Sequence, residues 1–161
     1  MIVTLRPMTE YDLTARNTAL TDDYALDLHK ARGISLDRAR VTAERQLADL
    51  LPDGAATKGM LLFTAATDGL SIGWIWISLP DASEESDTAW IYNIEVAAEH
   101  RGKGYGRAVV LAAEKELARL GVTRLGLNVF GDNAVAIHLY QSLGFHITSQ
   151  QMAKSITPDP E

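Results

Sequence analysis

The order of strand-like and helix-like patterns along this chain predicts a single α/β domain. Its 161 residues suit one domain with one sizeable hydrophobic core. Apolar runs and helical periodicities follow one another as strand, two helices, three strands, helix, strand, helix and a pair of strands. This order predicts a mixed, mostly antiparallel sheet of about seven strands with helices on both faces.

The N-terminal third is predicted to contain one strand and two helices. Residues 2–6 alternate in polarity and stop at Pro7, as a short strand does. Thr9 begins a capping-box pattern for a first helix, which Gly33 is placed to end. Ser35 can cap the second helix, which stops at a Pro-Asp-Gly sequence.

A hairpin and a central strand are predicted in the middle of the chain. Asp68-Gly69 separates the apolar runs 60–66 and 71–79, and Asp-Gly in this position is a strong hairpin signal. The second run is apolar on both faces, with its two tryptophans together on one of them. Such a strand is expected to lie centrally in the sheet and to be covered on both sides.

The C-terminal half is predicted to add the remaining strands and helices and a short tail. We expect one domain over 1–156. In chain order the elements are the strand 90–96, a helix that ends at Gly121, the strand 124–129, a helix over 133–142, the strands 145–147 and 152–156, and the tail 157–161.

Composition argues against several classes of function. Fifteen basic and 21 acidic residues give a formal charge of −6, whereas a nucleic-acid partner would call for a basic face. The chain has no cysteine, which excludes a disulfide and a cysteinyl acyl-enzyme within it. It shows no signal-peptide pattern, and no apolar run approaches the roughly 18 residues that span a bilayer. We therefore expect a cytoplasmic protein without a membrane partner.

The most informative segment joins the strand 90–96 to the helix that follows. Residues 101–107 place three glycines at alternate positions among three cations. The first N–H groups of a helix lack intrahelical partners, the helix dipole favours an anion there, and glycine lets a ligand approach closely. This glycine-rich loop is therefore a candidate phosphate-binding loop, made of Arg101, Gly102, Lys103, Gly104, Tyr105, Gly106 and Arg107.

Two better-known glycine motifs do not fit this loop. The P-loop needs Ser or Thr after Gly-Lys, but Gly104 follows Lys103. The dinucleotide fingerprint needs a third glycine where Val109 stands. The simplest alternative is a tight turn with solubilising charges and no ligand.

Two residues further along the chain favour ligand binding. Asn133 and Tyr140 lie two helical turns apart, so on a helix they share one face with a separation of about 10 Å. A long ligand that runs from the glycine-rich loop past this helix could meet both. Alternatively, Asn133 caps its helix and Tyr140 is a core aromatic with a solvated hydroxyl, and for Asn133 the two roles are compatible.

Both segments together resemble the GCN5-related N-acetyltransferases, the GNAT superfamily. Residues 94–106 resemble the acetyl-CoA loop of that family, whose pattern is Arg or Gln, two residues, Gly, one residue, then Gly or Ala. Residues 128–145 resemble its second signature, an Asn followed by Tyr and then Gly-Phe. Ala98 departs from the pattern, because many members carry proline there. The resemblance covers nearly the whole chain and implies a single-domain GNAT-like fold.

The resemblance implies how acetyl-CoA would be held. Backbone N–H groups of the glycine-rich loop would bind the pyrophosphate of coenzyme A, with charge-assisted contacts from its cations. The pantetheine arm would lie along the strand that ends at Val96, using main-chain hydrogen bonds there and at Ile94. The Val96 N–H would stabilise the oxyanion that forms on the thioester carbonyl. Asn133 and Tyr140 complete the cofactor-binding residues.

The implied chemistry needs two proton transfers. A lysine-like amine is protonated at neutral pH, so a base must accept its proton, and Glu95 is the first candidate because it adjoins Val96. Glu95 could instead be a strand carboxylate that pairs with an arginine or faces solvent, and a strand irregularity near 93–96 would decide where it points. Tyr140 is the natural proton donor to the leaving thiolate. Tyr92 and Asn93 are weaker candidates for orienting the acceptor.

The sequence and the resemblance together predict an acetyl-CoA-dependent N-acetyltransferase that acts on a small-molecule or peptide amine by direct transfer, without a metal. Alternatives are a non-catalytic acyl-CoA-binding sensor and a generic nucleotide binder. The resemblance also allows a homodimer. Two acidic groups could attract a cationic acceptor, although charge runs are more often solvated surface: Asp12, Asp22, Asp23 and Asp27 in the first helix, and Asp81, Glu84, Glu85 and Asp87 in the loop 80–88.

Overall fold

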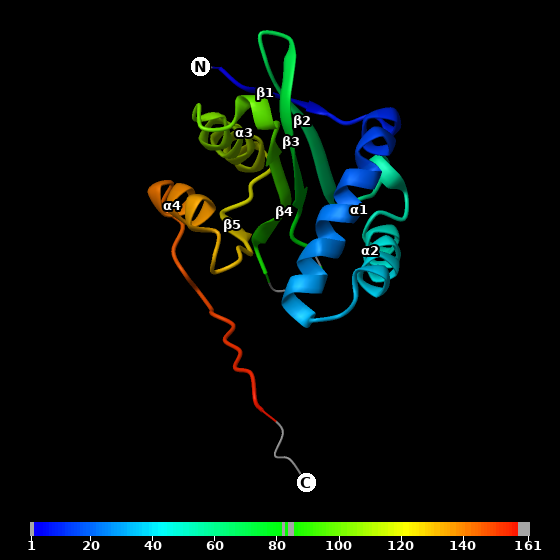
Figure 1. The fold of residues 1–161 in the computed structure, drawn as a ribbon. Coiled ribbons are helices and arrows are strands. Elements are labelled where there is room, and N and C mark those ends of the chain that lie inside the picture. Colours follow the sequence, from blue (N-terminus) through cyan, green and yellow to red (C-terminus); the bar gives the residue numbers. More distant parts are fainter. Residues whose placement is uncertain (1, 82, 84–85, 158–161) are drawn as a thin grey trace. The chain divides into compact units, whose positions relative to one another are not determined.

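The computed structural model describes residues 2–81, 83 and 86–157 (Figure 1). The contacts divide the chain into two compact units, Met1–Asn128 and Val129–Glu161. Its helices and strands, in chain order, are β1 (Thr4–Pro7), α1 (Glu10–Arg32), α2 (Leu36–Leu50), the 3₁₀ turn η1 (Gly54–Ala56), β2 (Met60–Thr67), β3 (Leu70–Ser78), β4 (Thr88–Val96), the 3₁₀ turn η2 (Ala98–His100), α3 (Tyr105–Arg119), β5 (Arg124–Leu127) and α4 (Ala134–Ser142).

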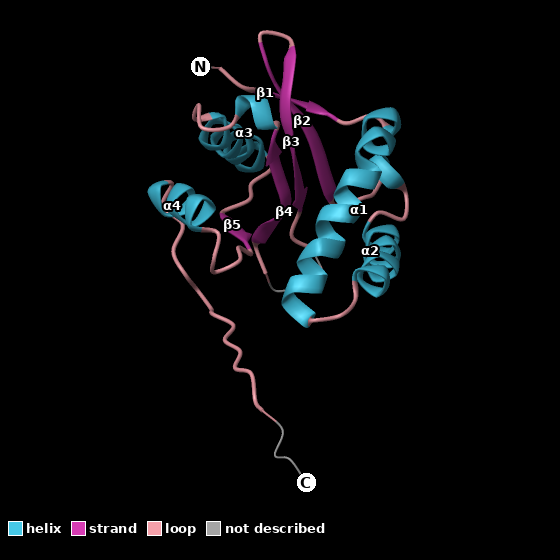
Figure 2. Ribbon diagram, viewed as in Figure 1, coloured by secondary structure: helices cyan, strands magenta, loops and turns pink. Residues whose placement is uncertain are grey.

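The first unit is a sheet covered by helices on both faces. Its strands lie in the order β1-β2-β3-β4-β5; β1 to β4 pair antiparallel, and β5 joins β4 in parallel after the crossover through α3. Helices α1 and α2 cover one face and α3 covers the other (Figure 2). The predicted α/β class, mixed sheet and two-sided helical cover are confirmed.

Strand β3 is the centre of the first unit, as its composition predicts. Trp74 and Trp76 are 1% and 2% exposed and join the core cluster beneath α1 and α2. Ile75 and Ile77 are fully buried in the opposite cluster with residues of α3. The side-chain alternation of one strand therefore supplies both cores.

The predicted hairpin turn and helix ends are confirmed. Asp68 and Gly69 have φ values of 49° and 79°, so both central residues of the β2–β3 turn are left-handed, as Asp-Gly favours. Gly33 ends α1 with φ 64° and donates its N–H to the carbonyl of His29. Ser35 accepts a hydrogen bond from the Arg38 N–H at the start of α2.

The second unit corrects the predicted strand count. The sheet has five strands among the described residues, not about seven, because 145–147 and 152–156 form no strand. The apolar side chains of this segment are mostly exposed: Ile147 is 61% and Met152 is 91% exposed. A two-stranded pair without a covering layer is marginal in water, so an apolar pattern alone does not make strands here.

Helix α4 forms as expected in this unit. Of the tail 157–161, positions 158–161 lie outside the described residues. The bounds of the predicted domain and tail therefore remain predictions.

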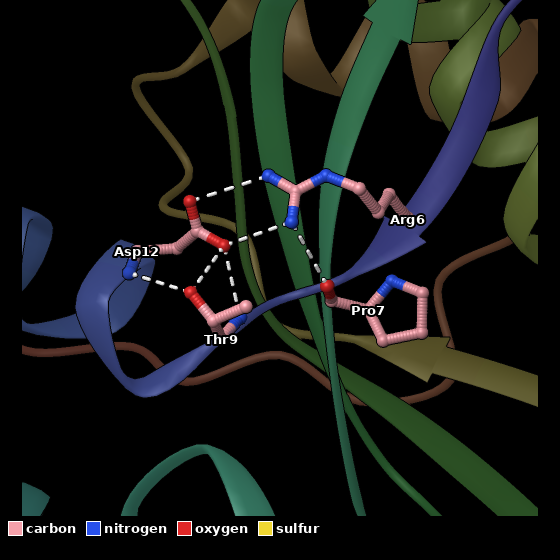
Figure 3. A network of polar contacts seen from close by, with 4 residues as sticks. All are labelled: Arg6, Pro7, Thr9 and Asp12. Carbon is pink, nitrogen blue, oxygen red and sulfur yellow. Dashed lines mark hydrogen bonds and ion pairs between the residues drawn. The ribbon is translucent and has the colours of Figure 1, made fainter.

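A compact polar network holds the start of α1 against the end of β1 (Figure 3). The Asp12 carboxylate accepts hydrogen bonds from both terminal nitrogens of Arg6, at 3.0 and 3.2 Å. It also accepts from the N–H and the hydroxyl of Thr9, each at 2.9 Å, while the Asp12 N–H donates to the Thr9 oxygen at 3.2 Å. The predicted capping box is confirmed, and Arg6 extends it into the sheet.

This network predicts acid sensitivity. The Arg6 guanidinium, followed by the N–H and hydroxyl of Thr9, holds the pKa of Asp12 well below its usual range. A lowered folded-state pKa adds stability that is complete above the unfolded value of about 3.9 and is lost as the pH falls below it. Asp12→Asn should therefore flatten the pH dependence of the urea unfolding midpoint below about pH 4. Arg6→Met should flatten it to a lesser degree, because the Thr9 hydrogen bonds to Asp12 remain, and profiles parallel to wild type would contradict the assignment.

Candidate active site

The glycine-rich loop has the backbone that its sequence predicts. Gly102 and Gly104 have φ values of 71° and 82°, which L-amino acids with side chains rarely adopt. A Cβ on either would meet no atom within 4 Å, so the space beside them is open. Gly104 is the N-cap of α3, and the Ala108 N–H donates to its carbonyl. The N–H groups of Tyr105 and Gly106 therefore precede the first hydrogen bond of the helix and are suited to an anion.

Two of the loop's cations hold the loop itself. The Arg101 Nε donates to the Val96 carbonyl at 2.8 Å, and the Lys103 Nζ donates to the Glu99 carbonyl at the same distance. His100 packs edge-on against Tyr105, with ring centroids 5.7 Å apart. A guanidinium has five donors and an ammonium three, so these contacts leave donor capacity for a phosphate.

Strand β4 presents an open backbone edge next to this loop. Strand β5 pairs only with Thr88–Ile91 of β4, so the paired stretch ends before Tyr92. The Ala97 N–H donates to the Ile72 carbonyl on β3, and N–H groups of successive residues in a strand alternate between the two edges. The N–H groups of Ile94 and Val96 therefore point to the opposite edge, where Arg101 caps the Val96 carbonyl.

A β-bulge at Tyr92 decides which side chains of β4 face which helices. Trp76 pairs with Asn93 and Ile77 with Ile91, so Tyr92 is an extra residue with no counterpart on β3. Ile91 packs in the α3 cluster, and so does Ile94, three positions later. A regular strand would place these two on opposite faces. The sequence left open whether an irregularity near 93–96 re-aims these side chains, and the structure has one immediately before that stretch.

The bulge turns Glu95 toward the α1/α2 face of the sheet. Its carboxylate oxygen Oε2 accepts a hydrogen bond from the indole Nε1 of Trp74 at 3.0 Å. Glu95 is half-buried, and among the described residues it forms no ion pair with a basic side chain. Its carboxylate therefore lies on a known face of the strand, with an aromatic N–H as its partner. This partner differs from the arginine or solvent that the sequence suggested as alternatives.

Gly73 and Trp74 also shape the surroundings of Glu95, and neither was predicted from the sequence. The Cβ of any larger residue at Gly73 would overlap the Glu95 carbonyl oxygen, because the β3 backbone passes close to β4 there. A glycine inside a strand pattern is the signal that could have indicated such an approach. The second of these residues, Trp74, is directly opposite Glu95 in the β3–β4 register.

Tyr92, a weaker candidate for orienting the acceptor, contacts the ring of Trp76 edge-on at a centroid distance of 5.2 Å.

Asn133 and Tyr140 belong to the second unit. Asn133 caps α4, since its side-chain oxygen accepts from the Ala136 N–H at 3.1 Å. Tyr140 is half-buried and packs edge-on against Phe145 at 5.7 Å. Burial raises the pKa of the Tyr140 phenol above its usual value. The capping role of Asn133 is confirmed, while ligand roles of both residues remain predictions.

Four of the eight acids considered for acceptor binding have partners within the chain. Asp12 pairs with Arg6 and Asp22 with Arg40. Asp81 accepts hydrogen bonds from Ser83, and Asp87 accepts one from Thr123. Glu84 and Glu85 lie outside the described residues. These contacts favour a structural role for Asp12, Asp22, Asp81 and Asp87.

Within 2–81, 83 and 86–157, no three His, Asp or Glu side chains gather in a way that could hold a metal ion. In the same part of the chain, no helix has the length and apolar character to cross a membrane.

These features define an α/β domain in which a strand with an open edge leads into a glycine-rich, phosphate-compatible helix start. The chain belongs to the acetyltransferase (GNAT) family, whose model matches residues 19–145. The suspected resemblance to GNAT enzymes is thereby confirmed.

Similar proteins include named N-acetyltransferases. The chain is 29% identical to the uncharacterized N-acetyltransferase YycN of Bacillus subtilis over 97% of its own length and 100% of that protein. The crystal structure of YycN superposes with a TM-score of 0.90, covering 97% of this chain and 99% of that one. The PaiA N-acetyltransferase of Thermoplasma acidophilum, solved with coenzyme A, shares the fold at 18% identity, a TM-score of 0.67 and 94% coverage of both chains.

The loop geometry yields a test of coenzyme A binding. Gly104→Ala should cost about 1–2 kcal/mol of folding stability, because alanine disfavours the left-handed backbone of Gly104. The loop backbone must then change, which should weaken acetyl-CoA binding about tenfold. Gly33→Ala is the matched control: it has a similar φ of 64° and equally open surroundings, at the end of α1. It should cost similar stability and leave acetyl-CoA affinity unchanged in calorimetry. Equal affinity in both variants would exclude the loop from binding.

Proposed function

We propose that this chain transfers an acetyl group from acetyl-CoA to a primary amine, either of a small molecule or of a peptide or protein. Membership of the acetyltransferase family and relatives named N-acetyltransferases support the class of reaction. The observation that carries the finer proposal is the Glu95 carboxylate, one residue before the Val96 N–H on the open edge of β4.

The proposed binding mode follows the backbone groups that the first unit exposes. The pyrophosphate of coenzyme A binds the N–H groups of the glycine-rich loop, and the pantetheine arm extends along the N–H edge at Ile94 and Val96. The thioester carbonyl then lies beside the Val96 N–H, which stabilises the developing oxyanion. Coenzyme A complexes among the solved structures of this fold support acetyl-CoA as the co-substrate.

The proposed reaction is a direct transfer. Glu95 accepts a proton from the ammonium group, and the free amine nitrogen then attacks the thioester carbon. A C–N bond forms, the C–S bond breaks, and the thiolate leaves with a proton from Tyr140. The second proton that the nitrogen loses passes through solvent to the Tyr140 phenolate and restores the phenol. The Tyr140 phenol is protonated across neutral pH, as a donor must be, and burial, which raises its pKa, makes it a weaker acid than a free tyrosine. The chain has no cysteine to form a covalent acyl intermediate.

The main alternative is a non-catalytic acyl-CoA-binding domain that senses or recruits. It predicts binding of acetyl-CoA without release of thiol on any amine. Measuring thiol release with a panel of small amines and peptides separates the two functions. Release that depends on one class of amine would identify the acceptor, and binding without release would establish the sensor.

Replacing the proposed base gives a direct test. Glu95→Gln keeps the size of the side chain and an acceptor oxygen for Trp74 but removes the basic carboxylate. We expect kcat at pH 7 to fall about 100-fold or more, the range typical of general bases, with acetyl-CoA affinity retained. A rate equal to wild type at pH 7 would remove Glu95 from the mechanism.

The proposed proton donor is tested separately. Tyr140→Phe removes the hydroxyl and keeps the ring that packs against Phe145. Because a thiolate is a fair leaving group, we expect turnover to fall by only about tenfold to 100-fold, and by more than acetyl-CoA affinity does. A larger loss of affinity with turnover intact would reassign Tyr140 to binding.

A further inference from the structure

Trp74 and Glu95 form a cross-strand pair beneath the proposed reaction centre. They are direct partners in the β3–β4 register, so both side chains stand on the same face of the sheet. The Trp74 indole is 1% exposed, and its single N–H donates to Glu95 Oε2 at 3.0 Å. A buried indole N–H cannot turn to water, so this carboxylate satisfies it.

The pair restricts the carboxylate more than its own chain would. A glutamate side chain has three rotatable bonds and samples many rotamers when nothing holds its end. Here the ring of Trp74 is fixed in the core cluster with Leu13, Leu62 and Trp76, and the N–H holds one carboxylate oxygen. The second oxygen is left to meet an acceptor. The holding group is neutral, so it orients the carboxylate without a cation that would compete with the incoming ammonium.

We propose that Trp74 is a positioning residue, which aims the Glu95 carboxylate at the acceptor amine. This inference rests on the proposed function. Trp74 touches neither substrate in this scheme and acts through Glu95 alone. This positioning role would account for a tryptophan at the position of β3 that lies directly opposite Glu95, the proposed base.

The chain offers a matched control in Trp76. It lies two residues along the same strand, on the same face and in the same cluster, and is 2% exposed. Its indole N–H donates to the Met60 sulfur at 3.4 Å instead of a carboxylate. Trp74→Phe and Trp76→Phe therefore remove the same atoms from comparable sites, and only the first releases Glu95.

We expect Trp74→Phe to lower kcat about 10- to 100-fold, the scale of a misplaced catalytic group, without changing the KM for acetyl-CoA. Trp76→Phe should lose similar stability in urea unfolding and keep kcat within about twofold of wild type. In the Glu95→Gln background, Trp74→Phe should cause no further loss, because its effect passes through the carboxylate. Equal losses in both backgrounds, or equal kcat losses in both tryptophan variants, would overturn the proposal.

A second measurement leaves Trp74 in place and needs no activity. In ¹H–¹⁵N spectra, the indole resonance of Trp74 should shift in Glu95→Ala while that of Trp76 does not. An unmoved Trp74 resonance would refute the contact and the proposal with it. If the resonance shifts in Glu95→Ala but the wild-type protein fails to release thiol from acetyl-CoA with any amine tested, the proposed function is refuted. The contact is then a structural one.

Discussion

The site depends on one extra residue in a strand. Side chains in a strand alternate between the two faces, so a single inserted residue transfers all later side chains to the other face. Tyr92 is that residue in β4. It lets Ile91 and Ile94 both pack toward α3, and it places Glu95 against Trp74 on the α1/α2 face. Without the bulge, Glu95 would point into the apolar cluster beneath α3, where an unpaired carboxylate is costly.

The end of the β4–β5 pairing has a related consequence. Because β5 stops pairing at Ile91, the backbone edge of β4 beyond that residue is available for hydrogen bonds. The same edge leads directly into the glycine-rich loop, where left-handed glycines expose the start of α3. Arg101 joins the two parts, since its Nε holds the Val96 carbonyl at the end of the strand. A ligand with a phosphate at one end and hydrogen-bonding amides along its length matches this continuous surface of donors.

Local signals explain what the sequence predicted well. The Asp68-Gly69 turn, the Thr9 capping box and the glycine that ends α1 depend on a few neighbouring residues, and each formed as expected. Helix caps and tight turns have backbone requirements that particular residue types meet, so composition at a short spacing is enough.

Non-local features were beyond the same reasoning. The bulge at Tyr92 is a mismatch between two paired strands, and neither strand shows it alone. The Trp74–Glu95 contact joins residues 21 apart in the sequence and requires the β3–β4 register. The prediction of strands at 145–147 and 152–156 was wrong for the opposite reason. Their apolar patterns are present, but strands need partners and cover that a local pattern does not supply.

Groups of β4 thus point in three directions, each with a different environment. Ile94 points into the α3 core and anchors the strand, the N–H groups of Ile94 and Val96 face the open edge, and Glu95 points to the α1/α2 face. In the proposed scheme, binding of the acyl donor and proton removal from the acceptor therefore involve different atoms of consecutive residues. Changes beneath α1 and α2 would then alter the acceptor side without disturbing the backbone proposed to bind the donor. Since Asp12 and Asp22 are held by arginines of the chain, acceptor choice on that face would rest more on shape and on Glu95 than on a general negative field.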